Sequence, residues 1–262
     1  MMRALWTAGT GMRAQQSNLD VISNNLANVN TTGFKKQRAE FEDLMYQTER
    51  QPGMTSSGNN NMLPTGIQMG HGVRLTATAR DFSQGNFQST SNAMDMVIEG
   101  DGFFQITMPD GTLAYTRNGA FKLDGNGNVV TSEGYLLEPA IQVSEGDTDF
   151  GVSRDGKVTV TDSKGKIKDL GDIVIARFIN NAGLKSIGKN LYTETVASGA
   201  PATGQPGENN AGTIVTNFVE MSNVQVVDEM VNMIVAQRAY EMNSKAVTTA
   251  DSMLEVAAGL KR

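Results

Sequence analysis

Two groups of residues near the middle of the chain have the spacing of known ligand-binding motifs. The run Gly100-Asp101-Gly102 opens like a dinucleotide-binding fingerprint, in which glycines let the backbone approach a pyrophosphate. Gln105 stands at the position of the third glycine, and no helix is expected to follow it. We therefore interpret this run as a turn between strands.

Asp124, Asn126 and Asn128 repeat the first three spacings of an EF-hand calcium loop. The sharp turn of that loop needs a glycine where Val129 stands, and a bidentate glutamate where Tyr135 stands. We predict a hairpin turn here and no cation site.

Other catalytic side chains are scarce in this sequence. His71 is the single histidine and there is no cysteine, which excludes a two-histidine metal site within one chain, a thiolate site and a disulfide. We interpret the carboxylate pairs Glu40/Glu42 and Asp228/Glu229 as solvated faces rather than acid–base pairs. The sequence also lacks the phosphate-loop and nucleophile-elbow motifs. We expect no enzymatic activity, no cofactor and no small-molecule substrate.

Composition and charge limit the classes of molecule that this chain is expected to bind. The 262 residues carry a net charge of −6 with no evident basic face, which argues against nucleic acid. No apolar run approaches the roughly 20 residues of a membrane span. Thr7, Thr10 and Arg13 interrupt any apolar core near the start, so a cleavable secretory signal is not predicted.

The elements that organise the chain lie at its two ends. Residues 224–260 contain no proline, and their only glycine is Gly259. Apolar and small residues recur there every seven positions, which is typical of a coiled coil. The columns are Val226, Met233, Tyr240, Val247 and Leu254; Ala239, Ala246, Met253 and Leu260; and Ala236, Asn243, Ala250 and Ala257.

A matching repeat runs through the N-terminal segment. A helix is predicted over residues 3–28 and is expected to end at Thr32-Gly33, because glycine is common just beyond helix ends. Its columns are Leu5, Met12, Leu19 and Leu26, and Ala8, Gln15, Ile22 and Val29. Trp6 is a candidate anchor, although a core aromatic residue fits equally well.

Two interpretations of these helices remain open. They could form a helical hairpin that clamps an ordinary monomer, or they could form the inner layer of a polymer. Ordering about 60 residues costs ~1 kcal/mol or more each in backbone entropy, whereas a seam of about 16 side chains returns only ~2 kcal/mol apiece. We therefore expect the termini to be loose in the monomer and to order on assembly, which limited proteolysis of dilute protein can test.

Short strands punctuated by turn signals fill the region between the helices. Pro109-Asp110-Gly111, Asn118-Gly119 and Asp124-Gly125-Asn126-Gly127 are typical hairpin turns. The predicted fold class is α+β, with terminal helices pairing as a coiled-coil layer around an inserted, mostly antiparallel β domain. The predicted divisions are a helix at 1–33, an extended linker at 34–75, the β domain at 76–199, a return segment at 200–221, and a helix at 222–262.

The same terminal residues carry a resemblance to a known family. Residues 23–35, read as SNNLANVNTTGFK, resemble the N-terminal signature of the bacterial flagellar rod and hook proteins. Residues 229–241, which contain EMVNMI and QRAYE, resemble their C-terminal motif. The stretches FEDLMYQ at 41–47, LPTGIQ at 63–68 and GHGV at 70–73 are similar to the distal-rod branch of that family. This resemblance covers the chain almost end to end.

The resemblance implies a structural subunit of the distal rod, which assembles through its terminal helices into a rigid helical tube and transmits motor torque to the hook. The implied partners are further copies of the chain, proximal rod proteins, the hook protein, surrounding ring proteins and the export apparatus. The implied location is the periplasmic rod of the flagellar basal body, reached without a cleaved signal. Alternatives are a hook or proximal rod protein and, more remotely, a monomeric secreted β-domain enzyme.

The predicted subunit-interface positions combine the heptad columns with the polar signature residues, because a buried amide that needs a partner can fix register. These positions are Leu5, Met12, Leu19, Ile22, Asn25, Leu26, Asn28, Val226, Met233, Gln237, Arg238, Tyr240, Val247 and Leu254. In the rod-specific stretch, which the resemblance places between subunits, the predicted anchors are Leu63, Ile67 and Met69.

Overall fold

The computed structural model describes residues 2–53, 64–144, 146–162, 165–208 and 210–259. The chain forms two compact units. The first, which we call the helical unit, takes its residues from Met1–Leu26, Gln37–Ala79 and Val226–Arg262. The second, the β unit, comprises Ala27–Lys36 and Arg80–Gln225. Both chain ends therefore belong to the same unit.

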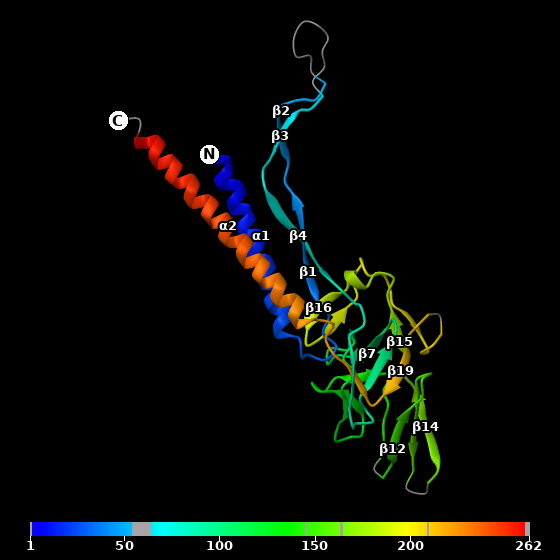
Figure 1. Cartoon of the computed structure of the whole chain (residues 1–262). Coiled ribbons are helices and arrows are strands. Elements are labelled where there is room, and N and C mark those ends of the chain that lie inside the picture. The colour runs from blue at the N-terminus through cyan, green and yellow to red at the C-terminus, as the bar shows by residue number, and fades with distance from the viewer. Residues whose placement is uncertain (1, 54–63, 145, 163–164, 209, 260–262) are drawn as a thin grey trace. The chain divides into compact units, whose positions relative to one another are not determined.

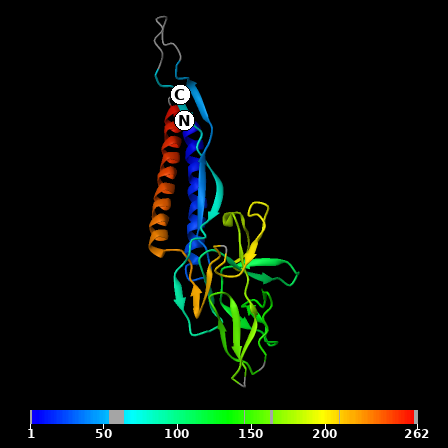
Figure 2. The same cartoon turned by 90° about the vertical axis from the view of Figure 1, so that its right-hand side faces the viewer.

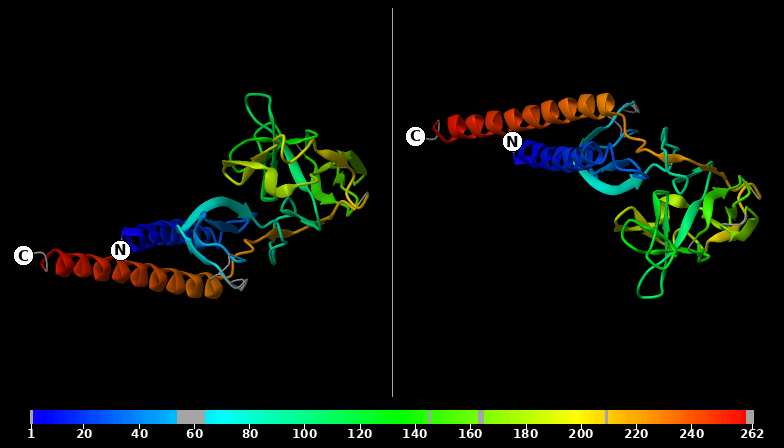
Figure 3. Two further views of the ribbon diagram at one scale, coloured as in Figure 1. Left: turned by 90° about the horizontal axis from the view of Figure 1, so that it is seen from above. Right: turned by 90° about the horizontal axis from the view of Figure 1, so that it is seen from below.

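Two long helices dominate the helical unit. α1 spans Met2–Ala27 and α2 spans Val226–Gly259. They run side by side in opposite directions, as Figures 1 and 3 show. Two contacts fix this antiparallel register: Asn25 meets Glu229 at one end of the pair, and Gly11 lies against Asn243 near the middle of α2. Within the described residues, neither helix is long and apolar enough to cross a membrane.

A β ribbon extends along α1 in the same unit (Figure 2). β1 (Gln37–Asp43) pairs with β4 (Val73–Arg80), and β2 (Tyr46–Arg50) pairs with β3 (Ile67–Gly70). Composition predicted a linker over most of this stretch, but its described residues form hydrogen-bonded strands. The polar glycine-rich sequence concealed them because a two-stranded ribbon needs little apolar alternation when most of its side chains are exposed.

The β unit is built on one larger sheet, in which β16, β17, β8, β7, β11, β10 and β9 follow one another and β15 joins β7 to β18. Its strands are β7 (Phe103–Thr107), β8 (Leu113–Thr116), β9 (Phe121–Leu123), β10 (Val129–Thr131), β11 (Leu136–Glu138), β15 (Ile175–Arg177), β16 (Lys185–Gly188), β17 (Leu191–Thr193) and β18 (Ala202–Gly204). A 3-10 turn, Asn181–Gly183, precedes β16.

Smaller sheets complete the β unit. β12 (Thr148–Val152), β13 (Lys157–Thr161) and β14 (Ile167–Asp172) form a three-stranded sheet. β19 (Thr213–Thr216) pairs with β6 (Met96–Glu99), and β20 (Phe218–Glu220) pairs with β5 (Phe87–Ser89). The returning chain thus adds its strands to the start of the insert.

Hydrophobic burial concentrates in the β unit. One cluster gathers buried apolar side chains from eight strands around Phe104 and Phe121, whose rings pack edge to face. A second cluster joins Phe103, Tyr115 and Tyr192. These two cores show that the insert has a complete apolar interior of its own.

The predicted fold class is confirmed: terminal helices in contact flank a mostly antiparallel β region. Asp124 and Asn128 close the hairpin between β9 and β10, as predicted. The predicted helix stop at Gly33 was wrong, since α1 ends at Ala27. Gly33 instead adopts a φ of 70° where a Cβ atom would lie 2.6 Å from the Asn118 backbone nitrogen. Close approach of two backbones, rather than helix capping, explains this glycine.

Candidate assembly surfaces of the terminal helices

The seam between α1 and α2 is made by small and polar residues rather than by the bulky heptad column. On α2, the positions that face α1 lie seven apart, at Glu229, Ala236, Asn243 and Ala250. Gly11 of α1 permits close approach, because a Cβ atom there would come within 2.9 Å of the Asn243 side-chain nitrogen. Small residues on both helices thus bring the backbones together.

Asn25 fixes the register at the base of this seam. Its Nδ2 donates to the Gln37 carbonyl at 2.8 Å and to Glu229 Oε2 at 3.2 Å, and its Oδ1 accepts from the Gln37 backbone N–H at 2.9 Å. Asn25 and Glu229 are each 1% exposed. The interpretation of Glu229 as part of a solvated face was therefore wrong. Its carboxylate lies in the first turn of α2, where the helix dipole favours negative charge.

The other end of α1 is tied to the ribbon. Arg3 donates to Gln47 Oε1 at 2.7 Å and to the Met69 sulfur at 2.8 Å, and its guanidinium lies 3.6 Å from Glu49. Farther along, the Val73 backbone N–H donates to the Thr10 hydroxyl at 3.4 Å. These contacts hold the ribbon against α1 on a side that α2 does not occupy.

Most of the apolar surface of α2 faces away from the seam. At about 100° per residue, a group of apolar side chains lies roughly 140–240° around the helix from Glu229. We call this group the outer face; it consists of Val227, Val231, Ile234, Val235 and Met242, which are 72%, 53%, 56%, 62% and 65% exposed. Arg238 lies on the same face, 2.9 Å from Glu241. Soluble proteins rarely leave so continuous an apolar strip uncovered unless another molecule packs on it.

The predicted interface residues separate into three groups by burial. Ile22 and Asn25 are buried inside the chain. The half-buried positions are Leu5, Met12, Leu19, Leu26, Asn28, Met233, Val247 and Leu254, and the exposed ones are Val226, Gln237, Arg238 and Tyr240. Ile67 and Met69 are exposed on the ribbon, and Leu63 lies outside the described residues. Trp6 is exposed on α1.

A buried charge cluster in the β unit escaped the sequence analysis. Lys35 Nζ lies 2.5 Å from Glu220 Oε1 and donates to the Ser83 carbonyl at 2.8 Å. Arg117 approaches Glu220 Oε2 at 3.6 Å, and all three side chains are at most 2% exposed. Burial lowers the pKa of the Lys35 ammonium, whereas the Glu220 carboxylate acts in the opposite direction. The only signal for this cluster in the sequence was Lys35, the last residue of the glycine-containing signature at 23–35.

The signature segment is held by backbone contacts as well. The Gly33 N–H donates to the Glu220 carbonyl at 2.8 Å, and Asn190 Nδ2 donates to the Thr32 carbonyl at 2.9 Å. Thr32 itself donates to Asn118 Oδ1 at 3.1 Å. Among the described residues no group of three or more acidic or histidine side chains could hold a metal ion. The three hydrogen bonds hold the signature segment against other parts of the β unit.

Comparison with known proteins identifies the family. Three family models match: "Flagella basal body rod protein" at residues 5–35, "Flagellar hook protein FlgE/F/G D1 domain" at 97–160 and "Flagellar basal body rod FlgEFG protein C-terminal" at 215–260. The chain is 54% identical to the flagellar basal-body rod protein FlgG of Borreliella burgdorferi, with all of both chains covered. The chain belongs to the FlgG family. It is a structural subunit of the distal rod of the flagellar basal body, not an enzyme.

Further FlgG relatives extend this similarity across distant bacteria. The chain is 46% identical to the protein of Caulobacter vibrioides over 99% of its length, and 43% identical to that of Bacillus subtilis over its whole length. A flagellar hook protein of Helicobacter mustelae is 46% identical, but the match covers 53% of this chain and 30% of that one. Because the FlgG relatives match along the full length and the hook protein matches only in part, the comparison favours a rod protein over a hook protein.

The N-terminal and C-terminal regions that match the rod family models meet in both buried polar clusters. Asn25 and Lys35 lie in the N-terminal match, while Glu229 and Glu220 lie in the C-terminal one. Each cluster therefore needs both ends of the chain. This pairing gives a physical reason why the rod motifs occur at opposite termini.

Proposed function

We propose that copies of this chain pack side by side through their terminal helices into a rigid helical tube that transmits motor torque to the hook. The observation that carries the proposal is the outer face of α2, which remains exposed after α1 and the ribbon have packed. Covering its five side chains would contribute on the order of 1 kcal/mol each, because each is already partly buried. Such increments accumulate when every subunit has several neighbours.

The position of this face favours open assembly. It lies on the side of α2 opposite the seam, and the proposed neighbour covers it with a different part of its own surface. A contact between two different patches repeats along a helix unless the rotation happens to close a ring. Structural subunits of a shaft require that open repeat.

The proposed neighbours follow from this role. Proximal rod proteins adjoin the tube below, the hook protein continues it, ring proteins surround it, and the flagellar export apparatus delivers the chain to the periplasm without a cleaved signal. The predicted rod-specific stretch at 34–75 would pack between subunits and stiffen the tube, with Ile67 and Met69 as anchors. Their exposure on the ribbon supports that role.

An apolar-to-charged substitution on the outer face tests the proposal. Ile234→Asp should leave the monomer folded, because the side chain is more than half exposed, yet it should abolish rods and motility when it replaces the native chain. Ile234→Met keeps the face apolar and should retain both. Circular dichroism of each purified monomer checks folding. Normal rods with Ile234→Asp would overturn the proposed role of this face.

A further inference from the structure

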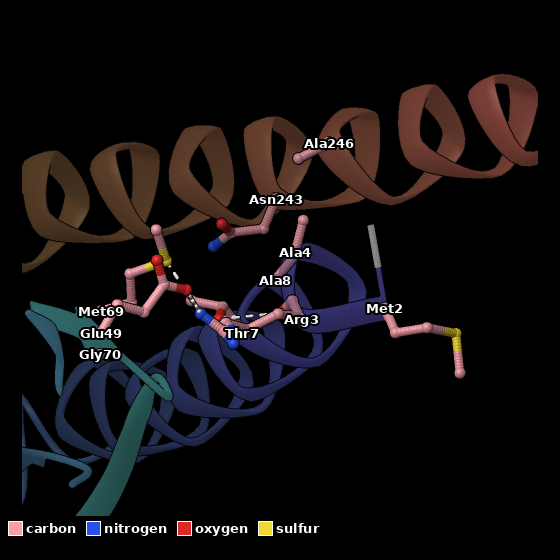
Figure 4. Close-up of a pocket in the computed structure, with 10 residues that line it drawn as sticks. All are labelled: Met2, Arg3, Ala4, Thr7, Ala8, Glu49, Met69, Gly70, Asn243 and Ala246. Carbon is pink, nitrogen blue, oxygen red and sulfur yellow. Dashed lines mark hydrogen bonds and ion pairs between the residues drawn. The ribbon is translucent and has the colours of Figure 1, made fainter. Parts of the chain in front are cut away.

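A cleft of about 1010 Å³ lies in the helical unit between α1, α2 and the ribbon (Figure 4). Ala4 and Ala8 of α1 form one wall, Asn243 and Ala246 of α2 form the second, and Met69 and Gly70 of the ribbon form the third. Figure 4 shows Asn243 projecting from α2 into the space between the two helices. The cleft is therefore a groove whose helical walls carry three alanines, Ala4, Ala8 and Ala246, among larger residues.

Arg3 keeps the walls of this cleft together. Its hydrogen bonds to Gln47 and Met69 join the first turn of α1 to the ribbon. The guanidinium is thereby engaged with the ribbon instead of projecting freely into the space. The cleft offers another molecule a depression in which Ala4, Ala8, Gly70 and Ala246 leave room, while Met2, Thr7, Glu49 and Asn243 complete its lining. Such a depression accepts a ridge of larger side chains.

The same unit carries a ridge of that kind. Val227, Val231 and Val235 lie four residues apart along the outer face, and Ile234 and Met242 lie beside them. Rows of side chains four apart are the ridges that enter grooves when helices pack. Ile234 lies about 120° around α2 from Ala246, and both residues belong to one helix, so the ridge and the cleft cannot meet within one chain.

We propose that the outer face of α2 inserts into this cleft on a second copy of the chain. The inference rests on the proposed rod function, and it adds the pair of surfaces through which neighbouring subunits meet. A second copy is the occupant that fits. Its outer face is convex and carries bulky side chains, whereas the cleft is concave and its alanine and glycine residues leave room for them. Each copy offers one of each surface, so the contact continues from copy to copy.

The proposal fixes an approximate stagger. Ile234, near the middle of the outer face, and Ala246, in the cleft, are 12 positions apart on one helix. At 1.5 Å per residue their Cα atoms lie roughly 18 Å apart within one chain. Neighbouring α2 helices that lie nearly parallel would then be offset by about that distance along their axes.

Disulfide cross-linking tests the contact directly, because the chain has no native cysteine. The variant with Ile234→Cys and Ala246→Cys cannot close a bridge within one chain, since disulfides need Cα atoms about 4.4–6.8 Å apart. Basal bodies isolated from cells that carry only this variant are oxidised and separated on a denaturing, non-reducing gel. The expected result is a ladder of dimers, trimers and longer chains that collapses on reduction.

Matched variants make the ladder diagnostic. Each single-cysteine variant should give dimers at most, because one sulfur cannot extend a chain. Ile234→Cys combined with Thr248→Cys moves the second sulfur two residues along α2, about 160° around the helix from Ala246, and should give no ladder. Rods without a ladder, or an equal ladder with Thr248→Cys, would overturn the ridge-in-cleft contact while leaving the rod function intact. Absence of the cysteine-free chain from isolated rods would instead refute the proposed function itself.

Discussion

Replacing Lys35 by methionine should destabilise the β unit strongly. The change removes the ammonium group 2.5 Å from Glu220 and the hydrogen bond to the Ser83 carbonyl, in a site where Lys35 is fully buried. Breaking a buried ion pair by removing one partner costs about 3–5 kcal/mol, because the remaining charge loses its compensation. Arg117 stays 3.6 Å from Glu220, and the Gly85 N–H still donates to the carboxylate at 2.9 Å. We therefore expect a loss near the lower end, about 3 kcal/mol.

Urea unfolding of the monomer at neutral pH measures this loss. Near-ultraviolet circular dichroism follows the β unit through the buried Tyr115 and Tyr192. Glu220→Gln combined with Lys35→Met removes the stranded charge, so the double variant should lose less free energy of unfolding than the sum of the two single variants. Lys189→Met, which breaks an exposed pair with Glu133, should leave the midpoint nearly unchanged. A loss below about 1 kcal/mol, or strictly additive single losses, would refute the buried-pair account.

Three further predictions follow from particular residues. In the same urea assay, Gly33→Ala should destabilise the β unit much more than Gly134→Ala does. Both glycines have positive φ, but only Gly33 has backbone within 2.6 Å of the added Cβ. Equal losses would contradict the close-approach argument. Burial raises the pKa of Tyr192, so its contribution to stability is complete below the unfolded pKa near 10 and is lost as pH rises through the folded pKa. Tyr192→Phe should therefore reduce the loss of stability above about pH 10, and an unchanged pH profile would count against it. Trypsin should cut dilute monomer first within the terminal helices, at sites such as Arg238 and Lys245, and leave the β unit, residues 27–36 and 80–225, resistant. Protease-resistant termini would contradict the expectation that they order on assembly.

The sequence predicted the helices and the antiparallel insert well because heptad spacing and hairpin turns are local signals. The sequence around α2 does not show which heptad column contacts α1 within the chain. The column beginning at Ala236 faces α1, because small residues on α2 and Gly11 on α1 allow close approach, while a strip of bulkier residues remains exposed. The heptad pattern has three columns on α2 and does not say which one meets α1.

The buried polar clusters were beyond sequence reasoning for a different reason. Lys35 and Glu220 are 185 positions apart, and Asn25 and Glu229 are 204 apart. A single charged residue is more often solvated than buried, so only the tertiary structure shows that each finds its partner at the other end of the chain. The ribbon was missed because exposed strands of a two-stranded sheet lack the apolar alternation that identifies strands.

Electron microscopy of basal bodies from cells that lack this gene tests the central claim most directly. The account predicts a rod that stops short of its distal part and carries no hook, with full length restored by the native gene. A complete rod that lacks only the hook would contradict the distal-rod role, and normal flagella would contradict any role for this chain in the rod.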